Sequence, residues 1–177
     1  MRVIGGEFRS RVLKSLPGMD VRPTPDRLRE TLFNILAPRI EGAVFADIYA
    51  GTGAVGIEAL SRGAARAIFV EQNRAAANVI RENLRSLNVM DRAELRASRA
   101  AIALPQIDAD IVFLDPPYRL EAEYERSLAI LDERAPRLVI AQHASRFELK
   151  ENYGALRRSR VVKHGDNALS FFEASTD

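Results

Sequence analysis

The chain of 177 residues is 47% hydrophobic and carries a formal net charge of +2, which suits one α/β domain and leaves little room for a second. It contains no cysteine, so disulfides, thiolate metal sites and thiol nucleophiles are excluded. No run of about 18 apolar residues occurs and the N-terminus alternates charged and apolar residues, so we expect a cytoplasmic protein without a membrane segment.

Both ends of the sequence are basic. Residues 1–40 hold eight Arg and Lys against four acidic residues, and residues 146–164 hold six against two. This distribution is expected if the two ends together form a surface that binds phosphate groups. The excess of Arg, 23 against three Lys, fits a codon bias equally well.

The first elements expected are a hairpin and a helix. Residues 2–14 alternate around Gly5 and Gly6, which predicts a β-hairpin-like extension over residues 1–20, in front of a core over 21–177. Thr24 is then read as an N-cap with Pro25 at the first helical position, and the helix is expected to end at Pro38.

From residue 43 onward, apolar runs alternate with helical patterns. Runs at 43–49, 67–71, 109–115 and 137–142 predict buried strands, and 54–62 and 73–87 predict the helices between them. This alternation is typical of a doubly wound, mostly parallel sheet. The runs at 160–163 and 168–172, joined by HGDN, predict a C-terminal antiparallel hairpin.

The stretch DIYAGTGAVG, residues 47–56, is a glycine loop between a strand and a helix. Glu71 lies 20 residues after Gly51, where an acid can bind ribose hydroxyls, so NAD and S-adenosylmethionine both fit. Asp47 favours the second, because its carboxylate would repel a pyrophosphate and attract an ammonium and a sulfonium. The alternative is that Asp47 caps a backbone turn.

The segment Asp115-Pro116-Pro117-Tyr118 follows another expected strand. The exocyclic amine of a base is a poor nucleophile, and the Asp115 carboxylate and Pro116 carbonyl could accept its two hydrogens and so turn its lone pair toward a methyl donor. Pro117 would stiffen the loop, and Tyr118 would stack on a flipped base. This chemistry needs no metal and no covalent intermediate. The alternative is an ordinary turn after a strand.

Together these segments resemble one family, the bacterial 16S rRNA (guanine(966)-N2)-methyltransferases, over almost the whole chain. The segments that carry the resemblance are RVIGGEFRSRVL, RPTPDRLRETLFN (22–34), DIYAGTGAVGIEALSRGA (47–64), FVEQN (69–73), FLDPPY (113–118) and KHGDNALSFF (163–172). The resemblance implies a seven-stranded Rossmann-like class I methyltransferase sheet with an N-terminal hairpin. It also implies methylation of a guanine N2 amine in 16S rRNA, free or within the small ribosomal subunit, by a monomer that uses S-adenosylmethionine.

The resemblance assigns site residues by position. Catalysis falls to Asp115, Pro116 and Tyr118, and substrate contact to Pro117, Arg22, Arg9 and Arg11. The cofactor residues would be Asp47, Tyr49, Gly51, Gly53, Glu71, Gln72, Ser98, Arg99 and Thr24. Arg99 stands where related enzymes usually place an acid for the adenine amine, so the Ser98 hydroxyl or the backbone would have to serve there.

Three other functions remain open on the sequence alone. The DPPY segment serves adenine as well as guanine amines, so an N6-adenine methyltransferase of DNA or RNA is the first. An NAD-dependent oxidoreductase is the second, disfavoured by Asp47 and by the absence of a task for DPPY. A noncatalytic RNA-binding relative that keeps the fold is the third.

Overall fold

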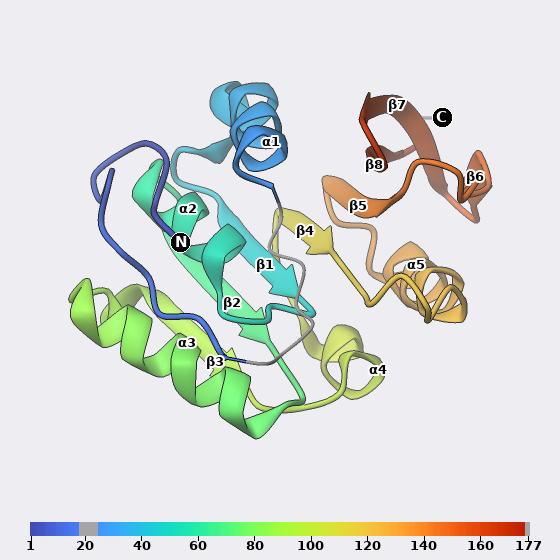
Figure 1. Cartoon of the computed structure of the whole chain (residues 1–177). Helices are drawn as coiled ribbons and strands as arrows, with labels where there is room; N and C mark the ends of the chain where they lie inside the picture. Colours follow the sequence, from blue (N-terminus) through green and yellow to red (C-terminus); the bar gives the residue numbers. More distant parts are fainter. Residues whose placement is uncertain (18–24, 176–177) are drawn as a thin grey trace.

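The computed structural model describes residues 1–17 and 25–175, which form a central sheet with helices on both faces (Figure 1). In chain order the elements are α1 (Asp26–Ile40), β1 (Val44–Ile48), α2 (Ala54–Ser61), β2 (Arg66–Val70), α3 (Arg74–Ser86), the 3₁₀ turn η1 (Met90–Arg92), β3 (Ala93–Arg96), α4 (Ala100–Ala103), η2 (Leu104–Gln106), β4 (Ile111–Leu114), α5 (Ala122–Arg134), β5 (Leu138–Ala144), β6 (Asn152–Tyr153), β7 (Leu156–His164) and β8 (Asn167–Ala174). The expected alternation of strands and helices from residue 43 onward is confirmed.

The sheet has the strand order β3-β2-β1-β4-β5-β8-β7-β6. Neighbours from β3 to β5 pair in parallel, and β8 pairs antiparallel with β5 on one side and β7 on the other. The doubly wound fold with its C-terminal antiparallel hairpin is therefore confirmed. The eighth strand, beyond the seven expected, is β6, a two-residue strand that pairs with the start of β7.

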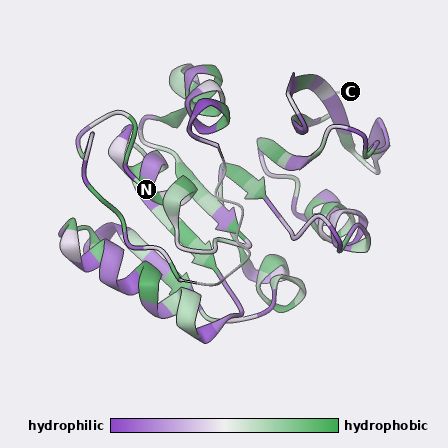
Figure 2. Ribbon diagram, viewed as in Figure 1, coloured by the Kyte–Doolittle hydropathy of each residue, from purple (hydrophilic) through white to green (hydrophobic). Residues whose placement is uncertain are grey.

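The helices form two layers around this sheet. Apolar residues of α1, α2 and α3 pack on one face, and those of α4 and α5 pack on the other. Covered on both sides, β1, β2, β4 and β5 are almost wholly buried, and apolar residues dominate them in Figure 2, where α3 alternates between apolar and polar. Because β1, β2 and β4 are parallel neighbours, their carboxyl ends meet at one edge of the sheet.

Helix α1 differs from the expectation at both ends. Pro25 is the N-cap residue rather than the first helical residue, and Thr24 lies outside the described residues. Pro38 does not end the helix, which continues to Ile40. The physical reason is packing: Ile40 is 2% exposed and completes the buried face of the helix, which offsets the missing amide of a proline in the last turn.

The N-terminal segment, residues 1–14, is hairpin-like, as expected. Arg2 and Val12 form an antiparallel bridge, and backbone bonds join Val3 to Arg11 (3.0 Å) and Leu13 to Met1 (2.8 Å). Other backbone groups of the segment bond to side chains of α2 and α3, and Val3, Phe8 and Leu13 pack against those helices. The neighbouring helices thus satisfy backbone groups that a longer strand ladder would otherwise pair. The division into an extension and a core at residue 20 stays a prediction.

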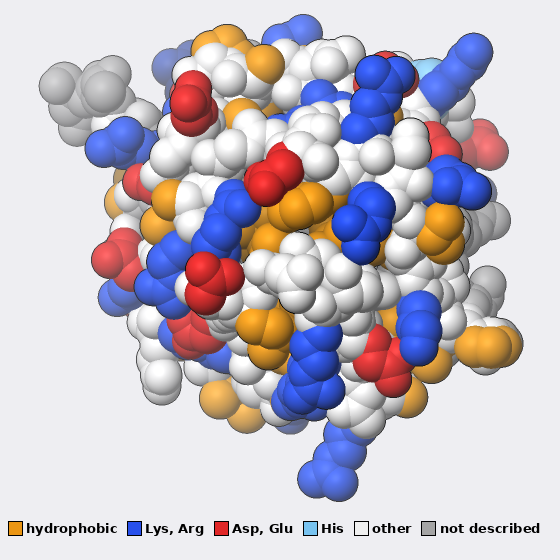
Figure 3. Space-filling model, turned by 90° about the vertical axis from the view of Figure 1, so that its left-hand side faces the viewer, with side chains coloured by type: hydrophobic (Ala, Val, Ile, Leu, Met, Phe, Trp, Pro, Cys, Tyr) orange, Lys and Arg blue, Asp and Glu red, His pale blue; other side chains and the backbone are white. Residues whose placement is uncertain are grey.

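The two basic ends of the chain are apart in one region and in contact in another. The N-terminal segment lies over α2 and α3, whereas β7 and β8 lie at the other side of the sheet (Figure 1). Helix α1, which belongs to the same basic end, packs against β8, and its Arg39 pairs with Glu173 (2.8 Å). On the face shown in Figure 3, Lys and Arg side chains are scattered among Asp and Glu. The surface also carries exposed ion pairs such as Lys14–Glu82 and Arg66–Glu94. The phosphate-binding surface expected from the sequence stays a prediction.

Within residues 1–17 and 25–175, none of the helices combines the length and the apolar composition that a bilayer crossing requires.

Candidate active site

Three carboxylates meet at the carboxyl edge of the sheet. Asp47 is the penultimate residue of β1, Glu71 directly follows β2 and Asp115 directly follows β4. Both Asp115 and Glu71 raise the pKa of Asp47 through charge repulsion, which places the three groups within electrostatic reach of one another. Such a cluster suits a cationic ligand and disfavours a pyrophosphate.

The glycine loop between β1 and α2 requires its glycines for two different reasons. Gly51 and Gly53 have φ of 59° and 85°, and Gly53 is the N-cap of α2. Gly56 faces β2, where a Cβ would lie 2.3 Å from the ring of Phe69. The loop therefore turns sharply and lets α2 pack closely on the sheet, which places the N-terminus of the helix at the carboxyl edge.

Asp47 is 2% exposed and its Oδ2 accepts a hydrogen bond from the Gly56 amide (2.9 Å). Burial raises the pKa of this carboxyl well above its ordinary value, while the Gly56 bond opposes the shift. The bond is direct support for the capping interpretation of Asp47. A buried carboxyl held in place this way still favours a cation, because a cation would stabilise its charged form.

Glu71 is bonded to the glycine loop itself. Its Oε2 accepts from the Gly51 amide (2.8 Å) and its Oε1 accepts from the Asn73 amide (3.0 Å). A carboxylate oxygen can accept two hydrogen bonds, so these contacts orient Glu71 without using up its capacity for ribose hydroxyls. The neighbouring Gln72 is exposed at the same edge.

Tyr49 has φ of 62°, in the left-handed region that a tyrosine rarely adopts. Its hydroxyl donates to Glu123 Oε2 (2.9 Å) and lies 2.9 Å from Ser127 Oγ, both on α5. Burial raises the pKa of the Tyr49 phenol, so the hydroxyl keeps its proton. The strained backbone before the glycines is thus held from the opposite helical layer.

The DPPY segment lies beside the glycine loop. The Asp115 amide reaches the Ile48 carbonyl (3.4 Å), which joins the ends of β4 and β1. Asp115 is partly buried, and this burial raises the pKa of its carboxyl to about 7. Pro116 is buried and Pro117 exposed, and the hydroxyl of Tyr118 donates to Asn167 Oδ1 of β8 (2.5 Å).

Those of the remaining predicted cofactor residues that the structure describes are not bonded to the glycine loop. Ser98 and Arg99 follow β3, the next strand along the edge, where the Ser98 hydroxyl donates to the Arg99 carbonyl (2.9 Å) and Arg99 is the exposed N-cap residue of α4. Thr24 and Arg22 lie outside the described residues.

The structure does not bring Arg9 and Arg11 to the carboxyl edge. They lie in the N-terminal segment near Ser61, at the C-terminal end of α2, and Arg11 donates to the Ser86 carbonyl at the end of α3 (2.8 Å). Both helix ends lie at the amino edge of the sheet, because α2 and α3 run back from the carboxyl edge. Their assignment to RNA contact stays a prediction.

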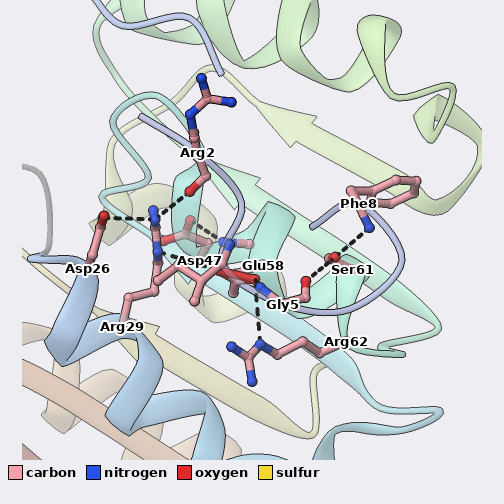
Figure 4. A network of polar contacts seen from close by, with 11 residues as sticks. Arg2, Gly5, Phe8, Asp26, Arg29, Asp47, Glu58, Ser61 and Arg62 are labelled. Carbon is pink, nitrogen blue, oxygen red and sulfur yellow. Dashed lines mark hydrogen bonds and ion pairs between the residues drawn. The ribbon is translucent and has the colours of Figure 1, made fainter. Parts of the chain in front are cut away.

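Sequence reasoning missed a polar network that fixes the N-terminal segment (Figure 4). Glu58 of α2, 1% exposed, accepts from the amides of Ile4 (2.8 Å) and Gly5 (3.1 Å). Arg29 of α1, fully buried, pairs with Glu58 (3.6 Å) and donates to the Arg2 carbonyl (2.7 Å). Burial lowers the pKa of Arg29, and Glu58 opposes that shift.

The same network continues at the end of α2 and on α3. Ser61 accepts from the Phe8 amide (2.9 Å) and donates to the Gly5 carbonyl (2.6 Å). Asn83, 2% exposed, bonds to both the amide and the carbonyl of Lys14. The available signal was that Arg29, Glu58 and Ser61 fall within the RPTPDRLRETLFN and EALSRGA segments that carry the resemblance, at positions where their helices are otherwise apolar.

Comparison with known proteins agrees with this arrangement. The family model described as conserved hypothetical protein 95 matches residues 1–173. The putative rRNA methyltransferase YlbH of Bacillus subtilis is 34% identical over 98% of both chains. Ribosomal RNA small subunit methyltransferase D of Escherichia coli is 46% identical over 67% of this chain and 61% of that enzyme.

Solved structures share the fold. The putative methyltransferase yhhF from Escherichia coli has a TM-score of 0.87 at 34% identity and covers 100% of this chain and 99% of its own. An RNA methyltransferase from Salinibacter ruber, solved with S-adenosyl-L-homocysteine, has a TM-score of 0.68 at 18% identity over 88% of this chain and 95% of its own. The second likeness supports the fold alone.

Proposed function

The chain belongs to the family described as conserved hypothetical protein 95, with members named as ribosomal RNA small subunit methyltransferases, and from that premise we propose that it methylates the N2 amine of a guanine in 16S rRNA. Family membership confirms the resemblance found in the sequence. The observation that carries the proposed chemistry is the meeting of Asp47, Glu71 and Asp115 beside the glycine loop and the DPPY segment.

The residues present suit S-adenosylmethionine, which would supply a methyl group on a positively charged sulfur. Its cationic groups match the cluster formed by Asp47, Glu71 and Asp115, and ribose hydroxyls suit the Glu71 carboxylate beside Gly51. Backbone amides at the start of α2 are available to polar groups, as helix N-termini are in general. A dinucleotide would bring its pyrophosphate against these acids, so an oxidoreductase is disfavoured.

Asp115 and Pro116 would hold the target amine. In its ionised form Asp115 accepts one N–H while the Pro116 carbonyl accepts the other, which directs the nitrogen lone pair at the methyl donor. After transfer the nitrogen must lose a proton, and a carboxylate with a pKa of about 7 can take it at neutral pH. Tyr118 would stack on a base flipped out of the RNA.

Relatives named for the small-subunit rRNA support an rRNA of the small subunit as the substrate. Guanine, rather than adenine, comes from the resemblance to the guanine-N2 enzymes. We propose that the protein works as a monomer in the cytoplasm, on 16S rRNA or on an assembly intermediate of the small subunit.

The test is transfer of labelled methyl from S-adenosylmethionine to 16S rRNA and to small subunits, both prepared from bacteria that lack the homologous enzyme. We expect incorporation into at least one of the two, and none with an Asp115→Ala variant that still binds S-adenosylhomocysteine. Absence of incorporation into either substrate, despite cofactor binding, would favour a noncatalytic RNA-binding relative instead.

A further inference from the structure

We propose that Asn167 is a positioning residue that sets the orientation of Tyr118 over the base site. The inference rests on the proposed function, since it assumes that Tyr118 contacts the flipped base. It gives a role to the C-terminal segment KHGDNALSFF, which carries the family resemblance and for which the sequence suggested no chemistry.

The contact joins a catalytic loop to a strand that is 49 residues away in the sequence. The Tyr118 hydroxyl donates to Asn167 Oδ1 at 2.5 Å, and both side chains are partly buried. Tyr118 lies between β4 and α5, in a segment whose own backbone contacts include a turn from Leu120 to Pro117. A tyrosine in such a loop has rotamer freedom to lose, so a fixed partner for its hydroxyl restricts where the ring lies.

Asn167 is itself a well-fixed partner. As the first residue of β8 it pairs with Ala144 of β5 and with His164 of β7. The backbone carbonyl of the preceding residue, Asp166, accepts a hydrogen bond from the Ser145 amide (2.9 Å). The Asn167 backbone is therefore held from both sides by the sheet, so its amide oxygen is a rigid reference point at the carboxyl edge.

The topology explains why the partner comes from the end of the chain. Strand β8 lies directly beside β5, whose other neighbour is β4, the strand that ends at Asp115. The β7–β8 turn is thus at the same edge as the DPPY segment. The C-terminal hairpin both completes the sheet and supplies the acceptor that orients the aromatic ring.

The experiment compares Asn167→Asp with Asn167→Ala. Aspartate keeps an acceptor oxygen at this position, whereas alanine removes it. Because the Tyr118 hydroxyl loses this acceptor, we expect Asn167→Ala to lower kcat/KM for RNA by about 10- to 100-fold. The affinity for S-adenosylhomocysteine should stay unchanged. Asn167→Asp should stay within about threefold of the wild type, and Asn152→Ala, at an exposed position on β6 at the far end of β7, is the matched control.

A double-mutant cycle with Tyr118→Phe tests the route of the effect. If Asn167 acts through the Tyr118 hydroxyl, the double variant Tyr118→Phe/Asn167→Ala should be no slower than either single variant. Additive losses, or an Asn167→Asp as slow as Asn167→Ala, would overturn the proposal. So would a parallel loss of S-adenosylhomocysteine binding, since that indicates general damage to the carboxyl edge.

A readout that needs no activity separates this proposal from the proposed function. In protein labelled with 3-fluorotyrosine, the ¹⁹F resonance of Tyr118, assigned with Tyr118→Phe, should shift in Asn167→Ala and stay near its place in Asn167→Asp. An inactive wild type with this ¹⁹F pattern would contradict the proposed function and support the contact. An unshifted resonance in Asn167→Ala would overturn the positioning role whatever the activity.

Discussion

The side-chain amide of Asn83 donates a hydrogen bond to the Thr52 carbonyl (3.1 Å), and the same side chain accepts from the Lys14 amide (2.8 Å) and donates to the Lys14 carbonyl (3.2 Å). One buried residue on α3 thus joins the glycine loop to the N-terminal segment. Because an unsatisfied buried polar group is costly, the position of the loop and that of the segment depend on each other.

Asn83→Asp should destabilise both the glycine loop and the N-terminal segment. Aspartate retains an acceptor for the Lys14 amide but puts a carboxylate oxygen against the carbonyls of Lys14 and Thr52. We expect a loss of about 1–3 kcal/mol in the free energy of unfolding and an affinity for S-adenosylhomocysteine about tenfold lower. The control is Asn78→Asp, at an exposed site on the same helix, and an unchanged affinity in Asn83→Asp would mean that the Thr52 contact serves the fold alone.

Glu58→Gln should release the N-terminal segment. Loss of the negative charge removes the buried counter-ion of the Arg29 guanidinium at 3.6 Å and leaves it only the exposed carboxylate of Asp26 (3.2 Å). Breaking a buried pair by removing one partner costs about 3–5 kcal/mol, whereas Glu82→Gln, in the exposed pair with Lys14, should cost about 0–1 kcal/mol. Urea unfolding measures the loss of stability in each variant, and hydrogen exchange at residues 3–8 should become faster only in Glu58→Gln. Equal effects of the two variants would show that the Glu58–Arg29 network does not hold the N-terminal segment in place.

Activity should fall as pH decreases through about 7, because the pKa of Asp115 lies there and the protonated carboxyl holds the amine less well. The sign for stability is opposite. Between the ordinary pKa of an aspartate and about 7, the folded state holds a proton that the unfolded state has lost, so stability decreases as pH rises through this window. Asp115→Asn should lack that slope.

Single-turnover rates measured from about pH 5.5 to about pH 8.5, a range that brackets the pKa of Asp115, test the predicted fall in activity. Asp115→Ala should lose about 100-fold or more in rate, while it keeps the fold and S-adenosylhomocysteine binding. A variant with nearly wild-type turnover would rule out the amine-holding role.

Binding of S-adenosylmethionine should release protons. Burial holds the pKa of Asp47 well above its ordinary value, and a bound cation favours the ionised carboxylate and so lowers that pKa. Affinity should therefore rise with pH below the pKa of the ligand-free protein. Calorimetry in two buffers of different ionisation enthalpy measures the number of protons released on binding. The same number in Asp47→Asn would show that Asp47 is not the source of these protons.

Arg9→Ala tests the predicted contact between RNA and the N-terminal segment. Loss of one phosphate contact should reduce the slope of log affinity against log salt by about one. Arg39→Ala is the control, since Arg39 already pairs with Glu173 at 2.8 Å. An unchanged slope for Arg9→Ala would agree with its location away from the carboxyl edge and would move the RNA surface elsewhere.

The sheet could be predicted from the sequence because buried strands and amphipathic helices have local signatures. The runs that became β1, β2, β4 and β5 are apolar without interruption, as double coverage by helices requires. The end of α1 could not be predicted in this way. Pro38 is a local signal for termination, and it was overridden by the burial of Ile40, a tertiary contact.

The meeting of the glycine loop, the acids and DPPY at one edge could be predicted because each of them follows a strand. Their supporting contacts could not, since they join positions far apart: 49 residues for Tyr118 and Asn167, 69 for Asn83 and Lys14, and 54 for Glu58 and Ile4. No periodicity links such pairs. The same limit explains why the contacts of the N-terminal segment with α2 and α3 were not predicted.

The central claim is that this carboxyl edge methylates guanine N2 in 16S rRNA. The most direct measurement is mass spectrometry of nucleosides from 16S rRNA of a strain that lacks the homologous enzyme, after treatment with this protein and S-adenosylmethionine. The account predicts new N2-methylguanosine with the wild type and none with Asp115→Ala. N6-methyladenosine in its place, or the same N2-methylguanosine signal with Asp115→Ala, would contradict it.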